Sequence, residues 1–172
     1  MKFQAAAWRA HDPKWSFTPL SGDDAAVHGG RFNPQGVPAL YLGLSIMTAV
    51  REANQGFAFK LDPCVLCEYA VDCDDVVDLR DDAARGAQGV APGDLAGDWM
   101  ALARSGAEPP SWALARRLVA AGAAGALVPS FAPGADDRDH NLVLWRWSEH
   151  LPHRVTVHDP SGRLPKNQLS WR

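Results

Sequence analysis

The chain has 172 residues, of which 47% are apolar and 22% are charged, and its formal net charge is −3. This length and balance are typical of one globular domain that buries a hydrophobic core. The slightly acidic total excludes binding of nucleic acid or an anionic membrane through overall charge, although local arginines can still bind a phosphate group. We therefore expect a single domain over residues 1–172 that binds no nucleic acid directly.

The first predicted element is a strand over residues 3–10, which ends at the break HDP in 11–13. No apolar run here is long enough for a signal peptide, and no later run could span a membrane, so we expect a cytoplasmic protein. Arg9 in this strand either faces water at an edge or reaches a ligand phosphate, because arginine is seldom buried without a partner. An irregular connection over 14–30 follows, and loops of this length are often functional.

The stretch 29–52 places three chemically distinct side chains on consecutive elements. Arg31 follows two glycines, which allow the backbone a positive φ or a close approach to a bound group. Tyr41 lies in a short apolar strand predicted over 38–42, and Glu52 lies at the margin of the apolar stripe of the next helix. A guanidinium, a phenol and a carboxylate placed in this way could surround one anionic, aromatic ligand.

The helix that carries Glu52 has a predicted N-cap at Ser45 and a predicted end at Gln55, because a glycine follows. The alternative interpretation of the whole stretch is a hairpin turn, a core strand and a surface helix. In that case Glu52 is a half-exposed acid that pairs with Arg51 or Lys60. The stretch alone does not decide between a ligand site and this structural interpretation.

Two further strands are predicted over 64–71 and 75–79, and the three cysteines of the chain lie in this region. Cys64 and Cys67 form a C-x-x-C pair, but an offset of three in a strand places two side chains on opposite faces. No second pair completes a zinc site. We expect reduced thiols and no bound metal.

Residues 80–110 form a polar insert rich in glycine, alanine and proline, in which a short helix is predicted over 99–104. A helix capped by Ser111 is predicted next and runs to Ala121. The small residues up to Val128 predict a buried strand that packs closely against its neighbours.

Ser130 lies where this buried strand meets a loop, which is a common place for functional groups. Because no G-x-S-x-G surrounds it, we expect a hydrogen-bonding hydroxyl rather than a nucleophile. The acidic loop 134–140 has no fixed spacing of metal ligands, so we interpret it as solvated. Strands are predicted over 141–147 and 154–158, and the tail 159–172 is polar.

Strands that alternate irregularly with helices predict an α+β fold with a mixed β-sheet core and flanking helices. Neither a G-x-G-x-x-G fingerprint nor a P-loop occurs in the chain. Any nucleotide must therefore be held by side chains and strand ends, and not by a glycine-rich helix start.

The order of several short motifs resembles the RES-domain toxin family, which is named for arginine, glutamate and serine. The motifs are Arg9 in a first strand, G-G-R-F-N-x-x-G at 29–36, Y-L at 41–42, Glu52, V-P-S at 128–130 and N-L-V-L at 141–144. The resemblance extends over about residues 5–158. RES proteins are similar in fold to ADP-ribosyltransferases and are the toxin halves of bacterial toxin–antitoxin pairs.

The resemblance implies an enzyme that consumes NAD as its substrate by cleaving the bond between nicotinamide and ribose. Arg31 and Arg9 would hold the NAD phosphates through their planar guanidinium groups. Tyr41 would border the nicotinamide ring, and Glu52 would be the catalytic carboxylate that stabilises the developing positive charge. Ser130 would hydrogen-bond the ligand or fix Glu52.

The residues leave the acceptor of ADP-ribose open. We favour a protein acceptor, which makes the chain an ADP-ribosyltransferase. Water would make it an NAD glycohydrolase, and phosphate would make it an NAD phosphorylase. The resemblance also implies a cognate antitoxin of the small, helical, DNA-binding type that blocks the NAD site, because unrestrained activity would arrest the cell. A hypothesis of another class is a module that binds a nucleotide or a partner protein without chemistry.

Overall fold

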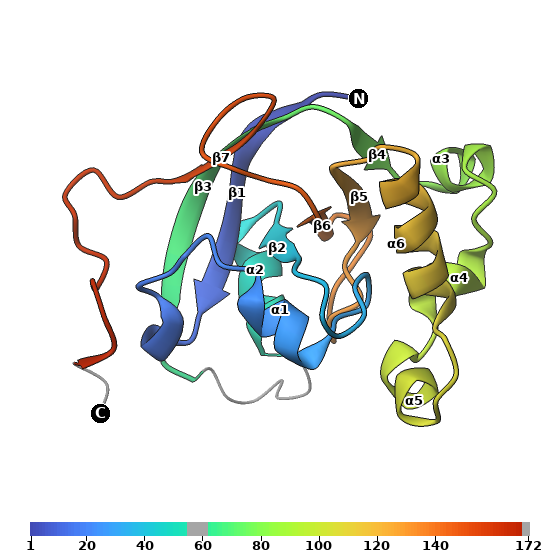
Figure 1. Ribbon diagram of the computed structural model, residues 1–172, viewed down its shortest axis with the longest axis horizontal. Helices are drawn as coiled ribbons and strands as arrows, with labels where there is room; N and C mark the ends of the chain where they lie inside the picture. Colours follow the sequence, from blue (N-terminus) through green and yellow to red (C-terminus); the bar gives the residue numbers. More distant parts are fainter. Residues whose placement is uncertain (55–61, 170–172) are drawn as a thin grey trace.

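The computed structural model describes residues 1–54 and 62–169, which build one seven-stranded mixed sheet with helices packed around it (Figure 1). The strand order is β4-β5-β6-β2-β1-β3-β7. Neighbouring strands are antiparallel except β4 and β5, which are parallel. The strands are β1 Phe3–His11, β2 Leu40–Gly43, β3 Val65–Cys73, β4 Val76–Asp78, β5 Gly125–Pro129, β6 His140–Leu144 and β7 His153–Val157. The α+β class predicted from the sequence is confirmed.

The helices lie in the connections between strands. They are α1 Asp23–His28, α2 Ile46–Ala53, α3 Asp82–Ala87, α4 Pro92–Ala96, α5 Trp99–Arg104 and α6 Pro110–Ala120, with a 3-10 turn at Pro13–Trp15. In Figure 1, α3, α4, α5 and α6 gather beside β5, and α1 and α2 lie near β2. Within the described residues, no helix is long and apolar enough to cross a membrane.

The sheet is weakly joined between β1 and β2. β1 pairs with β3 along its whole length, from Phe3 opposite Cys73 to His11 opposite Val65. β1 pairs with β2 only where Trp8 lies opposite Gly43. Helix α2 follows β2 directly and contacts both strands at this joint. The sheet therefore has room for a pocket between its two halves.

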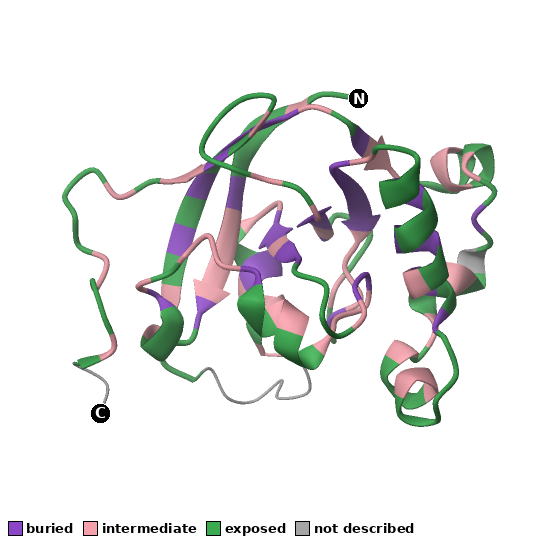
Figure 2. Ribbon diagram, in the orientation of Figure 1, coloured by how far each residue is buried: buried purple, intermediate pink, exposed green. Residues whose placement is uncertain are grey.

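Two hydrophobic cores lie on the two faces of the sheet, and β6 contributes to both. Leu142 and Leu144 belong to the core that contains Tyr69, whereas Val143 belongs to the core that contains Leu114 and other residues of the insert and α6. This alternation follows from the period of two in a strand. Figure 2 shows β5 and β6 as almost continuously buried strands beside α6.

Glycine is required where β5 meets β6. A Cβ at Gly125 would lie 2.4 Å from the carbonyl oxygen of Val143. Because such a contact is far inside van der Waals distance, only glycine allows the two strands to pair this closely. The run of small residues up to Val128 was correctly predicted to be a closely packed strand, which is β5.

Several predicted elements are in place, but the irregular segments contain more helix than predicted. The helix expected over 99–104 is present as α5. In addition, α1 lies within the connection predicted to be irregular over 14–30, and α3 and α4 lie within the insert 80–110. These helices have only five or six residues, so their apolar positions are too few to give a clear helical period.

Some predicted helix and strand ends were wrong, and two of them have a clear physical reason. Helix α6 has Pro109 as its N-cap, and Ser111 is buried inside the helix instead of capping it. Proline is favoured at a helix start because its missing N–H has no partner to lose there. Strand β6 ends at Leu144 and not at 147, since the amides of Trp145 and Arg146 both donate to Ala124 and leave the ladder. The predicted end of α2 at Gln55 lies outside the described residues.

Candidate functional site

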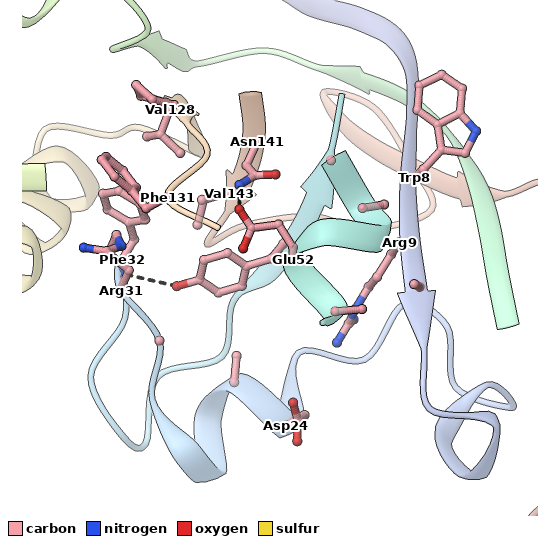
Figure 3. Close-up of a pocket in the computed structure, with 18 of the residues that line it drawn as sticks. Trp8, Arg9, Asp24, Arg31, Phe32, Glu52, Val128, Phe131, Asn141 and Val143 are labelled. Carbon is pink, nitrogen blue, oxygen red and sulfur yellow. Dashed lines mark hydrogen bonds between the residues drawn. The ribbon is translucent and has the colours of Figure 1, made fainter. Parts of the chain in front are cut away.

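A pocket of about 380 Å³ opens at the weak joint between β1 and β2 (Figure 3). This volume lies within the range of roughly 300–1,000 Å³ that is usual for small-molecule sites. Polar groups of opposite charge and several aromatic rings line it. The lining side chains that carry charge, hydrogen-bonding groups or rings are Trp8, Arg9, Asp24, Arg31, Phe32, Tyr41, Glu52, Trp99, Phe131 and Asn141.

Glu52 reaches this pocket because of how α2 begins. The hydroxyl of Ser45 accepts a hydrogen bond from the amide of Thr48 at 3.0 Å, which confirms Ser45 as the N-cap. A Cβ at Gly43 would lie 2.6 Å from the amide nitrogen of Ala49, so glycine lets α2 pack directly on the end of β2. Glu52 is one turn beyond Ala49 and thus points into the pocket from the helix.

Within the described residues, two side-chain donors hold the Glu52 carboxylate. The hydroxyl of Ser130 donates to Oε1 of Glu52 at 2.6 Å, and the side-chain amide of Asn141 donates to the same oxygen. Ser130 follows the end of β5, whereas Asn141 is the second residue of β6. Ser130 is absent from the described residues that line the pocket, so it lies behind Glu52 as seen from the cavity.

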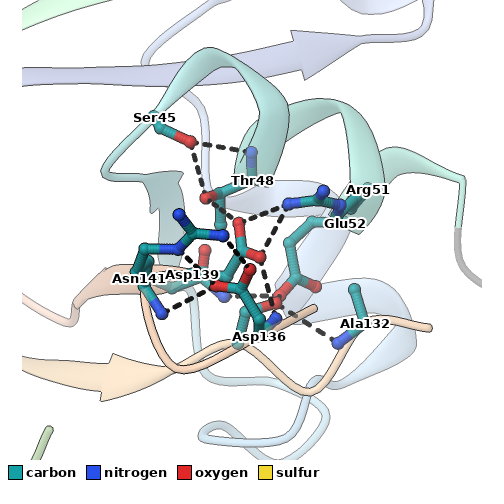
Figure 4. A network of polar contacts seen from close by, with 10 residues as sticks. Ser45, Thr48, Arg51, Glu52, Ala132, Asp136, Asp139 and Asn141 are labelled. Carbon is teal, nitrogen blue, oxygen red and sulfur yellow. Dashed lines mark hydrogen bonds and ion pairs between the residues drawn. The ribbon is translucent and has the colours of Figure 1, made fainter. Parts of the chain in front are cut away.

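A buried aspartate fixes α2 to the loop between β5 and β6 (Figure 4). Asp139 accepts hydrogen bonds from the hydroxyl of Thr48 at 2.6 Å and from Nη1 of Arg51 at 2.8 and 2.6 Å. It also accepts from the amide of Asp136 at 2.9 Å. Burial by itself raises the pKa of Asp139, but these donors outweigh it and hold the pKa of Asp139 below its ordinary value.

The prediction that the acidic loop 134–140 is solvated was wrong for Asp139, which is 4% exposed, and right for Asp136 and Asp137, which are exposed. Arg51 forms its ion pair with Asp139, and not with Glu52 as the alternative interpretation supposed. Lys60 lies outside the described residues. Among residues 1–54 and 62–169, no group of three or more His, Cys, Asp or Glu side chains is placed to hold a metal ion.

Tyr41 forms one wall of the pocket, and its hydroxyl organises the turn before β2. The hydroxyl donates to Oδ1 of Asn33 at 2.7 Å and accepts from the amide of Phe32 at 3.0 Å. A Cβ at Gly30 would lie 2.5 Å from this hydroxyl, so glycine is needed for the close approach. Burial raises the pKa of Tyr41 above its ordinary value, and the phenol therefore stays protonated at neutral pH.

Arg31 is held against the insert. Its Nη1 donates to the carbonyl oxygens of Leu95 at 2.8 Å and Gly97 at 2.7 Å, and its guanidinium lies 4.4 Å from the ring centroid of Phe131. Burial lowers the pKa of Arg31, while Glu52 acts in the opposite direction; arginine remains charged at neutral pH. The insert is thus a wall of the pocket and is fixed there by Arg31.

One tryptophan completes the same wall, and a second supports it. Trp99 of α5 lines the pocket, and its ring lies 6.3 Å from that of Trp112 in α6. The indole nitrogen of Trp112 donates to the carbonyl oxygen of Gly30 at 2.8 Å. The residue before Arg31 therefore anchors α6, and α6 supports Trp99.

Arg9 approaches the pocket from β1, on the other side of Glu52 from Arg31 (Figure 3). Its Nη1 donates to the carbonyl oxygen of Ser21 at 3.1 Å, which ties the connection after β1 to the strand. The pocket thus has a carboxylate between two guanidinium groups and aromatic rings on its walls. Such a site suits an anionic ligand with an aromatic ring, in which positive charge can develop near the carboxylate.

The five residues proposed from the sequence all lie at this pocket, four in its lining and Ser130 behind Glu52. Sequence reasoning missed Asn141 as a site residue, although it recognised the strand that begins there. A signal was present: Asn141 shares a face with Val143, and a polar side chain on a buried strand usually has a specific partner. Nothing local pointed to Trp99 or Phe131.

Comparison with known proteins gives a family match over most of the chain. The family model described as RES domain matches residues 6–167. The fold is similar to a crystal structure of the M. tuberculosis MbcT–MbcA toxin–antitoxin complex, with a TM-score of 0.64 and 24% sequence identity. The aligned region covers 92% of this chain and 84% of that chain. No curated protein matches the chain.

Proposed function

The chain belongs to the RES-domain family, and from this premise we propose that it binds NAD as a substrate and cleaves the bond between nicotinamide and ribose. The observation that carries the proposal is the Glu52 carboxylate, which Ser130 and Asn141 hold at the wall of a pocket of about 380 Å³. Arg9 and Arg31 lie on either side of it.

Cleavage of the bond between nicotinamide and ribose mainly requires negative charge beside the ribose carbon at which positive charge develops. When the glycosidic bond breaks, its electron pair leaves with nicotinamide, whose ring becomes neutral, and the ribose acquires oxocarbenium character at C1. A carboxylate beside that carbon stabilises the positive charge and can accept a hydrogen bond from a ribose hydroxyl. Glu52 takes this role, and the acceptor then bonds to C1 and loses its proton.

The two arginines serve the phosphates of the substrate. The bonds of Arg31 to Leu95 and Gly97 use Nη1, so its Nε and Nη2 groups can donate to a phosphate. Arg9 supplies a second guanidinium from β1. Tyr41 borders the nicotinamide ring with its own ring, because its hydroxyl is engaged by Asn33 and Phe32.

We take a protein side chain as the acceptor, which makes the reaction ADP-ribosyl transfer. Mass analysis of the products tests this choice against water and phosphate. A modified protein supports transfer, free ADP-ribose indicates glycohydrolase activity, and ADP-ribose 1″-phosphate indicates phosphorylase activity.

We further propose that the chain is the toxin of a toxin–antitoxin pair and acts in the cytoplasm, with an antitoxin that blocks the pocket. The similarity of fold to MbcT in its toxin–antitoxin complex supports this extension. Expression of the wild-type chain should arrest bacterial growth and lower cellular NAD, whereas Glu52→Gln should do neither. Co-expression of the neighbouring gene product should restore growth if that product is the antitoxin.

The experiment that tests the reaction is NAD consumption by purified wild type, Glu52→Gln and Glu149→Gln. We expect Glu52→Gln to lose about 10²-fold or more of the rate, because the carboxylate charge is removed with little change of shape. Glu149 is exposed and does not line the pocket, so Glu149→Gln should match wild type. NAD that binds without being consumed by any of the three would instead favour a module without chemistry.

A further inference from the structure

The side chain of Asn141 has two polar atoms, and within the described residues only one of them is hydrogen-bonded. Its side-chain nitrogen donates to Oε1 of Glu52 (Figure 3). The residue is 8% exposed, and its Oδ1 is buried without a hydrogen-bond partner among the described residues. Buried polar atoms nearly always have partners, so this arrangement needs an explanation.

The carboxylate of Glu52 determines which way the amide points. If Oδ1 faced Oε1, two acceptors would oppose each other, so the nitrogen must face Glu52 and Oδ1 must face away. The three residues that follow Asn141 in β6, Leu142, Val143 and Leu144, are apolar and fully buried. An apolar residue at 141 would extend that pattern and avoid the unpaired oxygen. Asparagine at this position is therefore unfavourable for the fold by itself.

We propose that Asn141 is a positioning residue for the cleavage of NAD proposed above, on which this role depends: it holds the Glu52 carboxylate in one orientation. Ser130 donates to the same oxygen at 2.6 Å from the end of β5. Ser130 after β5 and Asn141 in β6 therefore fix the rotation of the carboxylate together. The flexible side chain of Glu52 could not fix this rotation by itself.

Arg31, Tyr41 and Arg51 also lie near Glu52 within the described residues, but they do not duplicate this role. Arg31 and Tyr41 act on Glu52 through space, and Arg51 is bound to Asp139. Of the two donors, Ser130 and Asn141, only Asn141 also has a buried polar atom, Oδ1, without a hydrogen-bond partner among the described residues. The asparagine is thus explained by the N–H that it presents to Glu52.

Asn141→Leu separates positioning from folding. It removes the donor to Glu52 and also the unpaired oxygen, so these effects on stability oppose each other. We expect the thermal midpoint to stay within a few degrees of wild type or to rise. We expect kcat per folded protein to fall by about a hundredfold, with little change in KM, because misplacement of the reacting group acts on the chemical step. A normal kcat, or a midpoint that falls by more than about 10 °C, overturns the proposal.

Asn141→Asp provides a second, independent readout. It places one carboxylate against another, and two carboxylates in contact cannot both be ionised. We expect the acid limb of the profile of kcat/KM against pH to move to higher pH by about one unit or more. Asn167→Asp is the matched control: Asn167 is exposed, and its Oδ1 accepts from the amide of Leu169, a bond that aspartate can also make. An unmoved pH profile in Asn141→Asp sinks the positioning role.

Failure of the reaction and failure of the positioning role can be told apart. If wild type consumes no NAD, the proposed reaction fails, and the orientation role is then read from the ¹³C signal of the Glu52 carboxyl group. That signal should be broader in Asn141→Leu than in wild type, because a carboxyl group that has lost one donor can adopt more than one rotation. Equal line widths in the two proteins overturn the role of Asn141 whether or not NAD is consumed.

Discussion

His11 shows how one buried side chain makes the fold sensitive to pH. Its ring lies at the end of β1 and contacts the hydroxyl of Tyr69 in β3, while this hydroxyl donates to the carbonyl oxygen of Pro19. The ring nitrogen must therefore donate to Tyr69. Burial, with a smaller effect of Arg9, lowers the pKa of His11 to about 3, so the ring is neutral in the folded protein.

The unfolded chain protonates His11 near its ordinary pKa of about 6.5, so below that pH the unfolded state binds the extra proton. Stability from His11 is fully present above about pH 6.5 and is lost as pH falls towards 3, at roughly 1.4 kcal/mol per pH unit. His11→Gln keeps an N–H donor for Tyr69 but does not titrate. Urea unfolding at pH 7, 6 and 5 should give a flatter pH dependence for His11→Gln than for wild type.

The control for this experiment is His150→Gln, since His150 is exposed. Its loss of stability on acidification should equal that of wild type. If the free energy of unfolding of His11→Gln falls with pH at the same slope as that of wild type, the buried neutral histidine is not the source of the pH dependence.

Prediction at the residue scale succeeded where partners are close in sequence. Arg31, Tyr41 and Glu52 lie on consecutive elements, so the pattern of one short stretch indicated a shared site. The partners of Glu52 are distant: Ser130 is 78 positions away and Asn141 is 89 positions away. No local period predicts such pairings. Ser130 was singled out by its place at the end of a buried strand, but its link to Glu52 came only from the family resemblance.

At the scale of elements, the insert 80–110 is a part of the pocket and not a peripheral loop. Its helices are too short for a clear apolar period, so the sequence indicated only the helix at 99–104. Its place in the fold depends on Arg31, which is 64 positions from Leu95 and 66 from Gly97. The glycine, proline and alanine of the insert do not indicate that its backbone carbonyl groups accept hydrogen bonds from a guanidinium group.

The contact between Arg31 and the insert can be tested with Arg31→Lys. Lysine keeps the charge but cannot donate to two carbonyls while stacking on Phe131 with a planar group. We expect faster amide hydrogen exchange over residues 95–104 and a KM for NAD that is raised about tenfold or more. Arg117→Lys on the exposed side of α6 is the control and should change neither. Unchanged exchange in Arg31→Lys would show that the insert docks without this side chain.

At the scale of the whole molecule, the pocket joins two halves of one sheet. β1, β3 and β7 form one half, and β2, β6, β5 and β4 form the other, with a single pair between β1 and β2. The strands and the α+β class could be predicted from alternating apolar residues. The order of the strands could not, because it depends on pairings between segments far apart in the chain. The weak joint that makes room for the pocket is therefore a property of the assembled sheet.

A ligand in this joint should stabilise both halves of the molecule together. Glu52→Gln removes turnover, so its thermal midpoint can be measured with NAD or ADP-ribose present. Ligand at about 100 times its Kd adds roughly 2.7 kcal/mol to the free energy of unfolding, which corresponds to a rise of roughly 5–10 °C for a chain of this size. Adding Arg9→Gln to this variant should reduce the rise, whereas adding Arg163→Gln, at an exposed site in the tail, should not.

Hydrogen exchange in the same samples shows where the ligand acts. Because Arg9 belongs to β1 and Arg31 is bound to the insert, a ligand that engages both must slow exchange in β1 and in residues 95–104 at once. Protection confined to the insert would mean that the ligand is held by Arg31 alone, and the assignment of Arg9 to a substrate phosphate would then be wrong. Protection on both sides identifies the single Trp8–Gly43 pair as the place where substrate binding and the stability of the sheet are coupled.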